Sequence, residues 1–197
     1  MPGVPAGLGY IALAGLIFGE AAGLPIPGET ALIAAGGLAA TGRLQLPVVI
    51  LVAALAAIAG DTVGYWIGRR TGRWLLLRDG PLATHRREVV ERADRFFTRY
   101  GAGTIFFARF LPGLRYAGAV MAGASLMRWR RFALANAAGG VAWSTSVATI
   151  AFVAGPTGSI VLVVVANAVL ACLIVLAWRR RRTKLQKPTW SDRAVVE

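Results

Sequence analysis

Residues 132–178 read FALANAAGGVAWSTSVATIAFVAGPTGSIVLVVVANAVLACLIVLAW, without one charged side chain. A helix that spans a bilayer needs about 20 mostly apolar residues, so this stretch is long enough for two spans. Gly155-Pro156-Thr157-Gly158 interrupts it where a turn between them would fall. The chain of 197 residues is 56% hydrophobic and has a mean hydropathy of +0.60. The sequence therefore predicts an all-α polytopic membrane protein.

Two other apolar segments, 8–40 and 103–127, are interrupted at their centres by proline and by charge. Pro25 and Pro27 do not suit the middle of a straight spanning helix, because each lacks a backbone donor. Non-helical backbone at membrane depth is tolerated only where it is buried in protein or lines a cavity. Each segment is therefore predicted to be a re-entrant hairpin, with one helix in, an irregular tip and one helix out.

A polar, charged segment separates the two halves of the chain. Its apolar residues recur at helical spacing, which favours an amphipathic helix lying on the membrane surface. We expect one transmembrane domain over residues 1–182. Its predicted parts, with the polar tail that follows them, are a hairpin at 8–40, a span at 47–68, the amphipathic helix at 84–100, a second hairpin at 103–127, spans at 132–154 and 160–178, and the tail at 183–197.

The formal net charge of the chain is +13, and its basic residues cluster next to the apolar segments. Arginines cluster at 69–73, 86–99, 128–131 and 179–182, beside predicted spans, as the positive-inside rule expects. We therefore expect a membrane protein with a cytoplasmic C-terminus, and we do not expect nucleic-acid binding. A hairpin at 103–127 returns both of its basic flanks to the inside, which a full span would not do.

The two hairpins carry a repeated pattern. Phe18-Gly19-Glu20 precedes Pro27-Gly28-Glu29 in the first, and Phe107-Ala108-Arg109 precedes Pro112-Gly113-Leu114-Arg115 in the second. The two halves enter the membrane from opposite faces. Inverted repeats whose broken helices meet near the midplane are typical of secondary transporters. The alternative is chance similarity between two alanine- and glycine-rich stretches.

These motifs resemble the DedA family, whose core is also called the VTT or SNARE-associated domain. The resemblance covers residues 10–155 and rests on Glu20 with Pro25-Ile26-Pro27-Gly28-Glu29, on Gly60-Asp61-Thr62-Val63-Gly64-Tyr65-Trp66-Ile67-Gly68, and on Phe107 to Arg115 with Ala122-Gly123. It implies a multi-pass protein of the bacterial cytoplasmic membrane and transport linked to proton-motive force. In several bacterial members that transport recycles undecaprenyl phosphate, and related eukaryotic members scramble lipids. The functional residues it implies are Glu20, Glu29, Arg109 and Arg115. In this chain the second acid is glutamate rather than the commoner aspartate, and it follows the first at a shorter distance than in some members.

The four charged residues lie inside predicted membrane segments, where a charge has a high free-energy cost. A charge at the bilayer centre costs ~2.5–3.5 kcal/mol on insertion scales, so it usually faces a cavity or a partner. Arginine presents a planar donor fork that suits phosphate oxygens. We hypothesise that Arg109 and Arg115 bind a lipid phosphate, while Glu20 and Glu29 exchange a proton for the phosphate's place on the arginines. The alternative is a salt bridge between one of these acids and one of these arginines that only joins the hairpins.

Other residues are expected to support the site. Asp61 is predicted to cap or brace the hairpin through hydrogen bonds rather than to contact substrate. Glycines recur every four residues at Gly60, Gly64 and Gly68, as in close helix packing. The residues expected to shape the hairpin tips are Pro25, Pro27, Gly28, Pro112 and Gly113. The aromatic residues expected to pack or to lie at the membrane interface are Tyr65, Trp66 and Trp143.

The predicted function is a transporter that moves undecaprenyl phosphate or a similar lipid-linked phosphate, and its expected partners are membrane lipids. The alternatives are a proton-coupled antiporter of small ions or osmolytes and a phospholipid scramblase. An enzyme is not expected, because the only histidine, His85, lies in a basic loop and the only cysteine, Cys172, in an apolar run. No disulfide, metal or cofactor is expected either. The sequence leaves a homodimer open.

Overall fold

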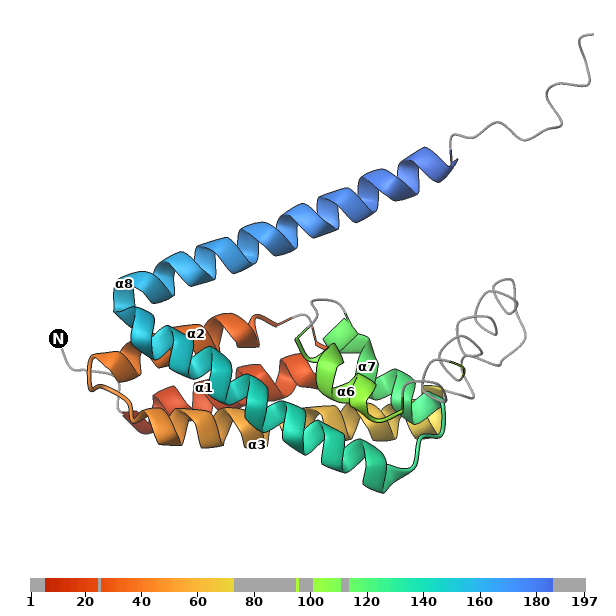
Figure 1. The fold of residues 1–197 in the computed structure, drawn as a ribbon, viewed down its shortest axis with the longest axis horizontal. Coiled ribbons are helices and arrows are strands. Elements are labelled where there is room, and N and C mark those ends of the chain that lie inside the picture. The colour runs from red at the N-terminus through yellow and green to blue at the C-terminus, as the bar shows by residue number, and fades with distance from the viewer. Residues whose placement is uncertain (1–5, 25, 73–94, 96–100, 111–113, 186–197) are drawn as a thin grey trace, which may run out of the picture.

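The computed structural model describes residues 6–24, 26–72, 95, 101–110 and 114–185, and every regular element in these ranges is helical. The predicted all-α class is confirmed. The amphipathic helix predicted at 84–100 lies outside the described residues except for Arg95, and so does the tail beyond residue 185. In chain order the elements are α1 (Ala6–Ala21), α2 (Gly28–Ala40), α3 (Leu46–Ile67), the π-helical turn η1 (Gly68–Gly72), α6 (Gly103–Ala108), α7 (Leu114–Ala124) and α8 (Trp129–Leu185) (Figure 1).

The first predicted hairpin is a pair of short helices joined by an irregular tip. After α1, Gly23 has a φ of 102°, a left-handed value that glycine adopts at little cost. Pro27, which has no backbone N–H, takes the N-cap position of α2. At about 1.5 Å per residue, the 16 residues of α1 and the 13 of α2 fall short of the ~30 Å hydrocarbon core. Neither helix is long enough to cross a bilayer.

The second predicted hairpin has the same order of parts on a smaller scale. α6 has 6 residues and ends at Arg109, its C-cap, and α7 has 11 residues and begins at Leu114. The expected tip residues Pro112 and Gly113 lie outside the described residues, as does Pro25 of the first hairpin. Each half of the chain thus consists of two short helices around a tip, followed by a long helix, α3 or α8.

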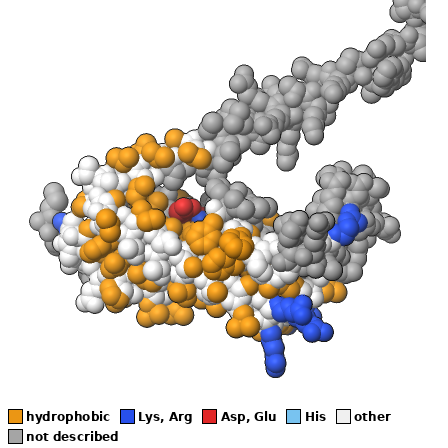
Figure 2. Space-filling view, viewed as in Figure 1, with side chains coloured by type: hydrophobic (Ala, Val, Ile, Leu, Met, Phe, Trp, Pro, Cys, Tyr) orange, Lys and Arg blue, Asp and Glu red, His pale blue; other side chains and the backbone are white. Residues whose placement is uncertain are grey.

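Among the residues that the structure describes, two segments are long and apolar enough to cross a membrane. They are Leu46–Thr71, which contains α3, and Trp129–Val169 within α8. The first agrees closely with the span predicted at 47–68. Large apolar side chains also cover the outside of the described helices (Figure 2), among them Leu51, Leu55 and Leu134. A surface this apolar suits contact with lipid rather than with water.

α8 is broken at Gly155, whose φ of 68° and ψ of −174° are not helical. The chain reverses its direction there (Figure 1), so the spans predicted at 132–154 and 160–178 fall on either side of the break. The break is narrower than the turn predicted at 155–159. Helix resumes at Pro156, because the fixed φ of proline suits the first position of a helix.

Two of the three regularly spaced glycines of α3 and the start of η1 confirm the predicted close packing. A Cβ on Gly60 would lie 2.5 Å from the carbonyl oxygen of Phe18 in α1, and a Cβ on Gly68 would collide with the backbone of Val120 in α7. Gly64 is different, because a Cβ there would meet Ala119 at an ordinary 3.5 Å. Glycine is therefore needed where α3 passes each hairpin, and α3 contacts both.

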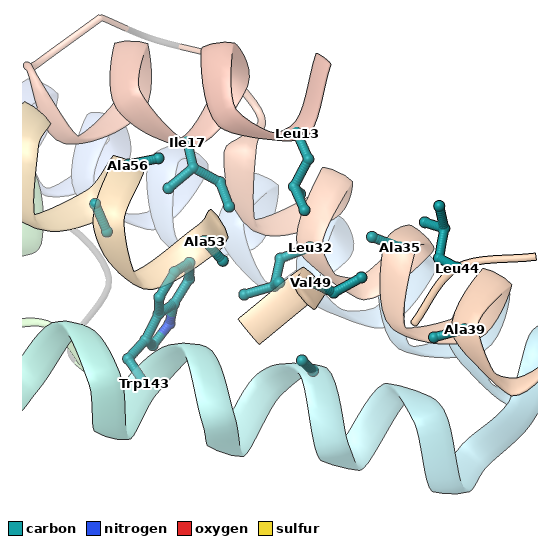
Figure 3. Close-up of a cluster of buried hydrophobic side chains, with 12 residues drawn as sticks. Leu13, Ile17, Leu32, Ala35, Ala39, Leu44, Val49, Ala53, Ala56 and Trp143 are labelled. Atoms are coloured by element: carbon teal, nitrogen blue, oxygen red, sulfur yellow. The ribbon is translucent and has the colours of Figure 1, made fainter. Parts of the chain in front are cut away.

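The main hydrophobic core lies where α1, α2, α3 and the first half of α8 meet (Figure 3). Small side chains make up much of it, so the helix backbones approach one another closely. Trp143 of α8 is the largest side chain in this core and reaches toward α1 and α3. Other buried members are Leu13, Ile17, Leu32, Ala35, Val49, Ala53 and Ala57.

Candidate functional site

Arg115 lies between two carboxylates of the opposite hairpin. Its Nη1 donates to Oε2 of Glu29 at 2.8 Å, and its Nη2 donates to Oε2 of Glu20 at 2.9 Å. The side chains of Glu20 and Arg115 are 3% and 12% exposed, whereas that of Glu29 is 43% exposed. Three of the four residues predicted to form the site therefore meet directly, and Glu29 lies on its open side.

The two hairpins place their charges at equivalent positions. Glu20 and Arg109 stand at the C-terminal ends of α1 and α6, and Glu29 and Arg115 are each the second residue of α2 and α7. A helix N-terminus favours anions and a C-terminus favours cations. Glu20 and Arg115 are thus each at the less favourable end of their helix, and they pair with each other. This correspondence supports the predicted repeat.

Arg109 has a different set of partners from the predicted ones. Its Nη2 forms an ion pair with Oδ2 of Asp61 in α3 and donates to Oδ1 of Asn136 in α8 at 2.7 Å. Asn136 in turn donates from Nδ2 to the carbonyl oxygen of Ile58 at 3.2 Å. All three polar side chains are buried. Arg109 therefore joins α6 to α3 and α8, and the bracing role expected of Asp61 operates through this arginine.

Sequence reasoning did not single out Asn136 as a site residue or Asp61 as the partner of Arg109. A signal was present, because Asp61 carries a charge inside a predicted span and needs a partner as much as the hairpin charges do. Asn136 is a polar residue in the long helix of the second half, as Asp61 is in the first. No pattern within either segment indicates which arginine each would contact.

Trp143 lies against the guanidinium of Arg115. The Cζ atom of Arg115 is 4.7 Å from the centroid of the indole ring, within the range of a cation–π interaction. The sequence predicted packing for Trp143, and its burial in the main core confirms that. The same ring also limits how the arginine fork can rotate, which sequence reasoning missed.

Gly28 allows α2 to begin beside Glu20. A Cβ at this position would lie 2.6 Å from Oε2 of Glu20 and 3.0 Å from the Cα of Ile17. Gly28, one of the expected tip residues, thus lies directly against the charged cluster. Any larger residue would move the carboxylate that Arg115 binds.

A small cavity of about 20 Å³ lies at the centre of this cluster. A water molecule needs roughly 10–15 Å³ measured in this way, so the space suits one or two waters rather than a phosphate group. Acidic and basic atoms lie side by side in a hollow of the surface (Figure 2). The ion pairs therefore fill the site in this conformation. The lining residues are Ile17, Glu20, Ala21, Ala57, Asp61, Ile105, Ala108, Arg109, Arg115, Gly118 and Ala119.

Residues 26–153 match the sequence profile of the VTT domain. The chain belongs to the DedA family of VTT-domain membrane proteins. The match includes Glu29, Asp61, Arg109 and Arg115, and Glu20 lies just before it. The resemblance drawn from the three sequence motifs is confirmed.

Similar proteins come from several bacteria. An uncharacterized membrane protein of Synechocystis sp. is 38% identical over 136 residues, which are 69% of this chain and 62% of the relative. One of Mycobacterium tuberculosis is 33% identical over 156 residues, 77% of this chain and 72% of the relative. Protein DedA of Escherichia coli is 34% identical over 120 residues, 60% of this chain and 54% of DedA. The match thus spans less than two thirds of the first and third of these relatives, and no solved structure matches this chain.

Proposed function

We propose that this DedA-family protein moves a lipid-linked phosphate, undecaprenyl phosphate or a similar prenyl phosphate, across the bacterial cytoplasmic membrane with the proton-motive force. The observation that carries the proposal is the position of Arg115, which donates to Glu20 and Glu29 of the opposite hairpin. A guanidinium that holds two carboxylate oxygens also fits two oxygens of a phosphate. Phosphate would therefore compete with the acids for the same donors.

Proton coupling follows from the charges of the cluster. Glu20, Glu29 and Asp61 face Arg109 and Arg115, so these five described side chains carry one negative charge in excess. Uptake of one proton removes the excess and frees one edge of Arg115 for phosphate. Glu29 is the most exposed of the three acids and is the acceptor we propose.

The two arginines have different roles in this proposal. Arg109 is neutralised by Asp61 and held by Asn136, so it fixes α6 and contributes positive potential. Arg115 pairs with Glu20 and with Glu29, whose side chain is 43% exposed and open to a proton, so Arg115 is the main ligand of the phosphate. The sequence-based hypothesis gave both arginines the same role.

The hairpins are proposed to be re-entrant, because α1, α2, α6 and α7 are each too short to span the bilayer. Their tips would meet near the midplane, where a phosphate could reach Arg115 while its prenyl chain stays in lipid. We place the arginine-rich ends of the spans and the C-terminus in the cytoplasm. A non-enzymatic role is part of the same proposal.

The proposal is tested in proteoliposomes by following the movement of a prenyl phosphate between leaflets. We expect wild-type protein to transport it and Arg115→Gln to abolish transport. Arg43→Gln removes the charge of an exposed arginine that is distant from Arg115 in the sequence, and it should leave transport unchanged. Movement of a small anion but not of lipid would favour an antiporter. Movement of neutral phospholipid without a proton gradient would favour a scramblase, and release of inorganic phosphate would favour an enzyme.

A further inference from the structure

A second basic cluster lies away from the central site, where the end of α3 and η1 meets the start of α8. We call it the arginine–tryptophan patch, and its members are Trp66, Arg70, Arg128, Trp129, Arg130 and Arg131. All six side chains are exposed. Basic side chains gather at one end of the molecule on this face (Figure 2).

The patch stands on a rigid base. The Tyr65 hydroxyl donates to the carbonyl oxygen of Met127 at 2.5 Å, and Nη1 of Arg69 donates to that hydroxyl at 2.9 Å and to the same carbonyl at 3.2 Å. The Tyr65 ring also stacks on Phe132, with centroids 4.4 Å apart. Both rings are buried. These contacts fix the turn before α8 against the end of α3, so the exposed arginines on the two segments keep their spacing.

Two exposed tryptophans indicate that the patch lies at the level of the lipid headgroups. Trp66 and Trp129 are 40% and 37% exposed, and their ring centroids lie 5.7 Å apart. Trp66 lies near the end of the apolar span Leu46–Thr71, and Trp129 is the first residue of the apolar span Trp129–Val169. Tryptophan at the end of a span lies at the level of the lipid headgroups. The Cζ atom of Arg70 is 5.7 Å from the Trp66 ring centroid, so its charge lies at the same level.

The charge of the patch is not balanced by the described part of the protein. The three carboxylates of the described ranges, Glu20, Glu29 and Asp61, all pair with arginines of the central cluster. None of them faces Arg70 or the arginines at the start of α8. Exposed positive charge at headgroup depth attracts anionic lipid.

We infer that the arginine–tryptophan patch binds the phosphate headgroup of an anionic phospholipid, with the tryptophan rings against its glycerol and upper acyl region. The site is separate from Arg115 and does not depend on the proposed transport. It would hold the α3–α8 end of the protein at an anionic membrane face. Its ligand is a resident lipid rather than the transported one.

The inference is tested by native mass spectrometry of the full chain in detergent, with phosphatidylglycerol and phosphatidylcholine of the same acyl chains. We expect selective retention of phosphatidylglycerol. Arg70→Gln, Arg128→Gln, Arg130→Gln and Arg131→Gln should each weaken it about fivefold, the factor that corresponds to ~1 kcal/mol per arginine. Arg43→Gln is the matched control and should have no effect. Soluble glycerol phosphate, which lacks acyl chains, should not compete.

A second measurement uses wild-type protein and needs no substitution. It follows the retention of phosphatidylglycerol as the salt concentration is raised, and we expect high salt to release the lipid. Equal retention of phosphatidylcholine, retention that ignores salt, or wild-type affinity in all four patch variants would overturn the inference. Arg115→Gln should keep phosphatidylglycerol bound while losing transport. Failure of the patch and failure of the proposed transport therefore give different results.

Discussion

Arg115 donates to the carboxylate of Glu20 across 2.9 Å, although 95 positions separate the two residues in the chain. The contact joins the second residue of α7 to the end of α1, and so it links the two hairpins. Each partner stands at the less favourable end of its helix dipole. An arrangement of this kind is better suited to exchange of partners than to stability, and the predictions below follow from it.

Loss of Arg115 should weaken the binding of prenyl phosphate. Arg115→Gln removes two charge-assisted hydrogen bonds that a phosphate would use, each worth about 1.5–3 kcal/mol. Binding of prenyl phosphate in detergent should weaken at least about tenfold. Arg115→Lys keeps the charge but not the fork, and should recover only part of the affinity. Wild-type affinity in Arg115→Gln would remove this residue from the binding site.

Loss of Arg109 should affect stability more than binding. Arg109→Gln leaves the buried Asp61 without its cation, which costs about 3–5 kcal/mol. Thermal unfolding in detergent should move to clearly lower temperature. The double variant Asp61→Asn with Arg109→Gln should recover much of the loss, because no uncompensated carboxylate remains. No recovery in the double variant would show that the two residues are not coupled.

The acids should make phosphate binding depend on pH. Lowering the pH favours protonation of the hairpin acids, which releases Arg115, so affinity for prenyl phosphate should rise. Glu29→Gln imitates the protonated state, and we expect it to bind tightly with a weakened pH dependence. The same measurement on Glu20→Gln shows how much Glu20 contributes to the pH dependence of binding. An unchanged pH profile in either variant would remove that acid from proton coupling.

Transport should require Gly28, because a larger residue at this position leaves no space for the carboxylate of Glu20. Gly28→Ala places a Cβ 2.6 Å from Oε2 of Glu20, so the carboxylate must move away from Arg115. Transport should fall sharply. Gly15→Ala in α1 is the matched control, because a Cβ there meets nothing within 4 Å and alanine is the better helix former by about 0.5–1 kcal/mol. Equal transport in the two variants would contradict the proposed role of Gly28.

Trp143 should act through the orientation of Arg115. Trp143→Leu loses both packing and the cation–π contact, whereas Trp143→Phe keeps a weaker aromatic face. We expect the phenylalanine variant to bind prenyl phosphate better than the leucine variant. Both variants also lose core volume, so their unfolding temperatures give the control. Binding that follows unfolding temperature alone would leave Trp143 a packing residue only.

Composition and proline placement were enough to predict most of the fold. Uncharged length predicted the spans, and Pro25 and Pro27 predicted where a helix could not continue. The break in α8 was predicted from Gly155 and Pro156, and its width was overestimated because proline begins a helix as readily as it ends one.

The site was harder to predict, because its contacts depend on the packing of distant helices. The cost of charge in lipid identified Glu20, Glu29, Arg109 and Arg115. The same cost could not indicate which acid pairs with which arginine. That pairing depends on how closely the chain packs against each hairpin at Gly60 and Gly68. Asp61 and Asn136 thus became partners of Arg109 through tertiary packing alone.

The central claim is that protonation of the hairpin acids admits a lipid phosphate to Arg115. The most direct test measures prenyl phosphate transport in proteoliposomes with and without an imposed pH gradient, in wild-type protein and in Glu29→Gln. We predict that the gradient accelerates transport by wild-type protein and has much less effect on the variant. Equal wild-type rates with and without the gradient would contradict the account.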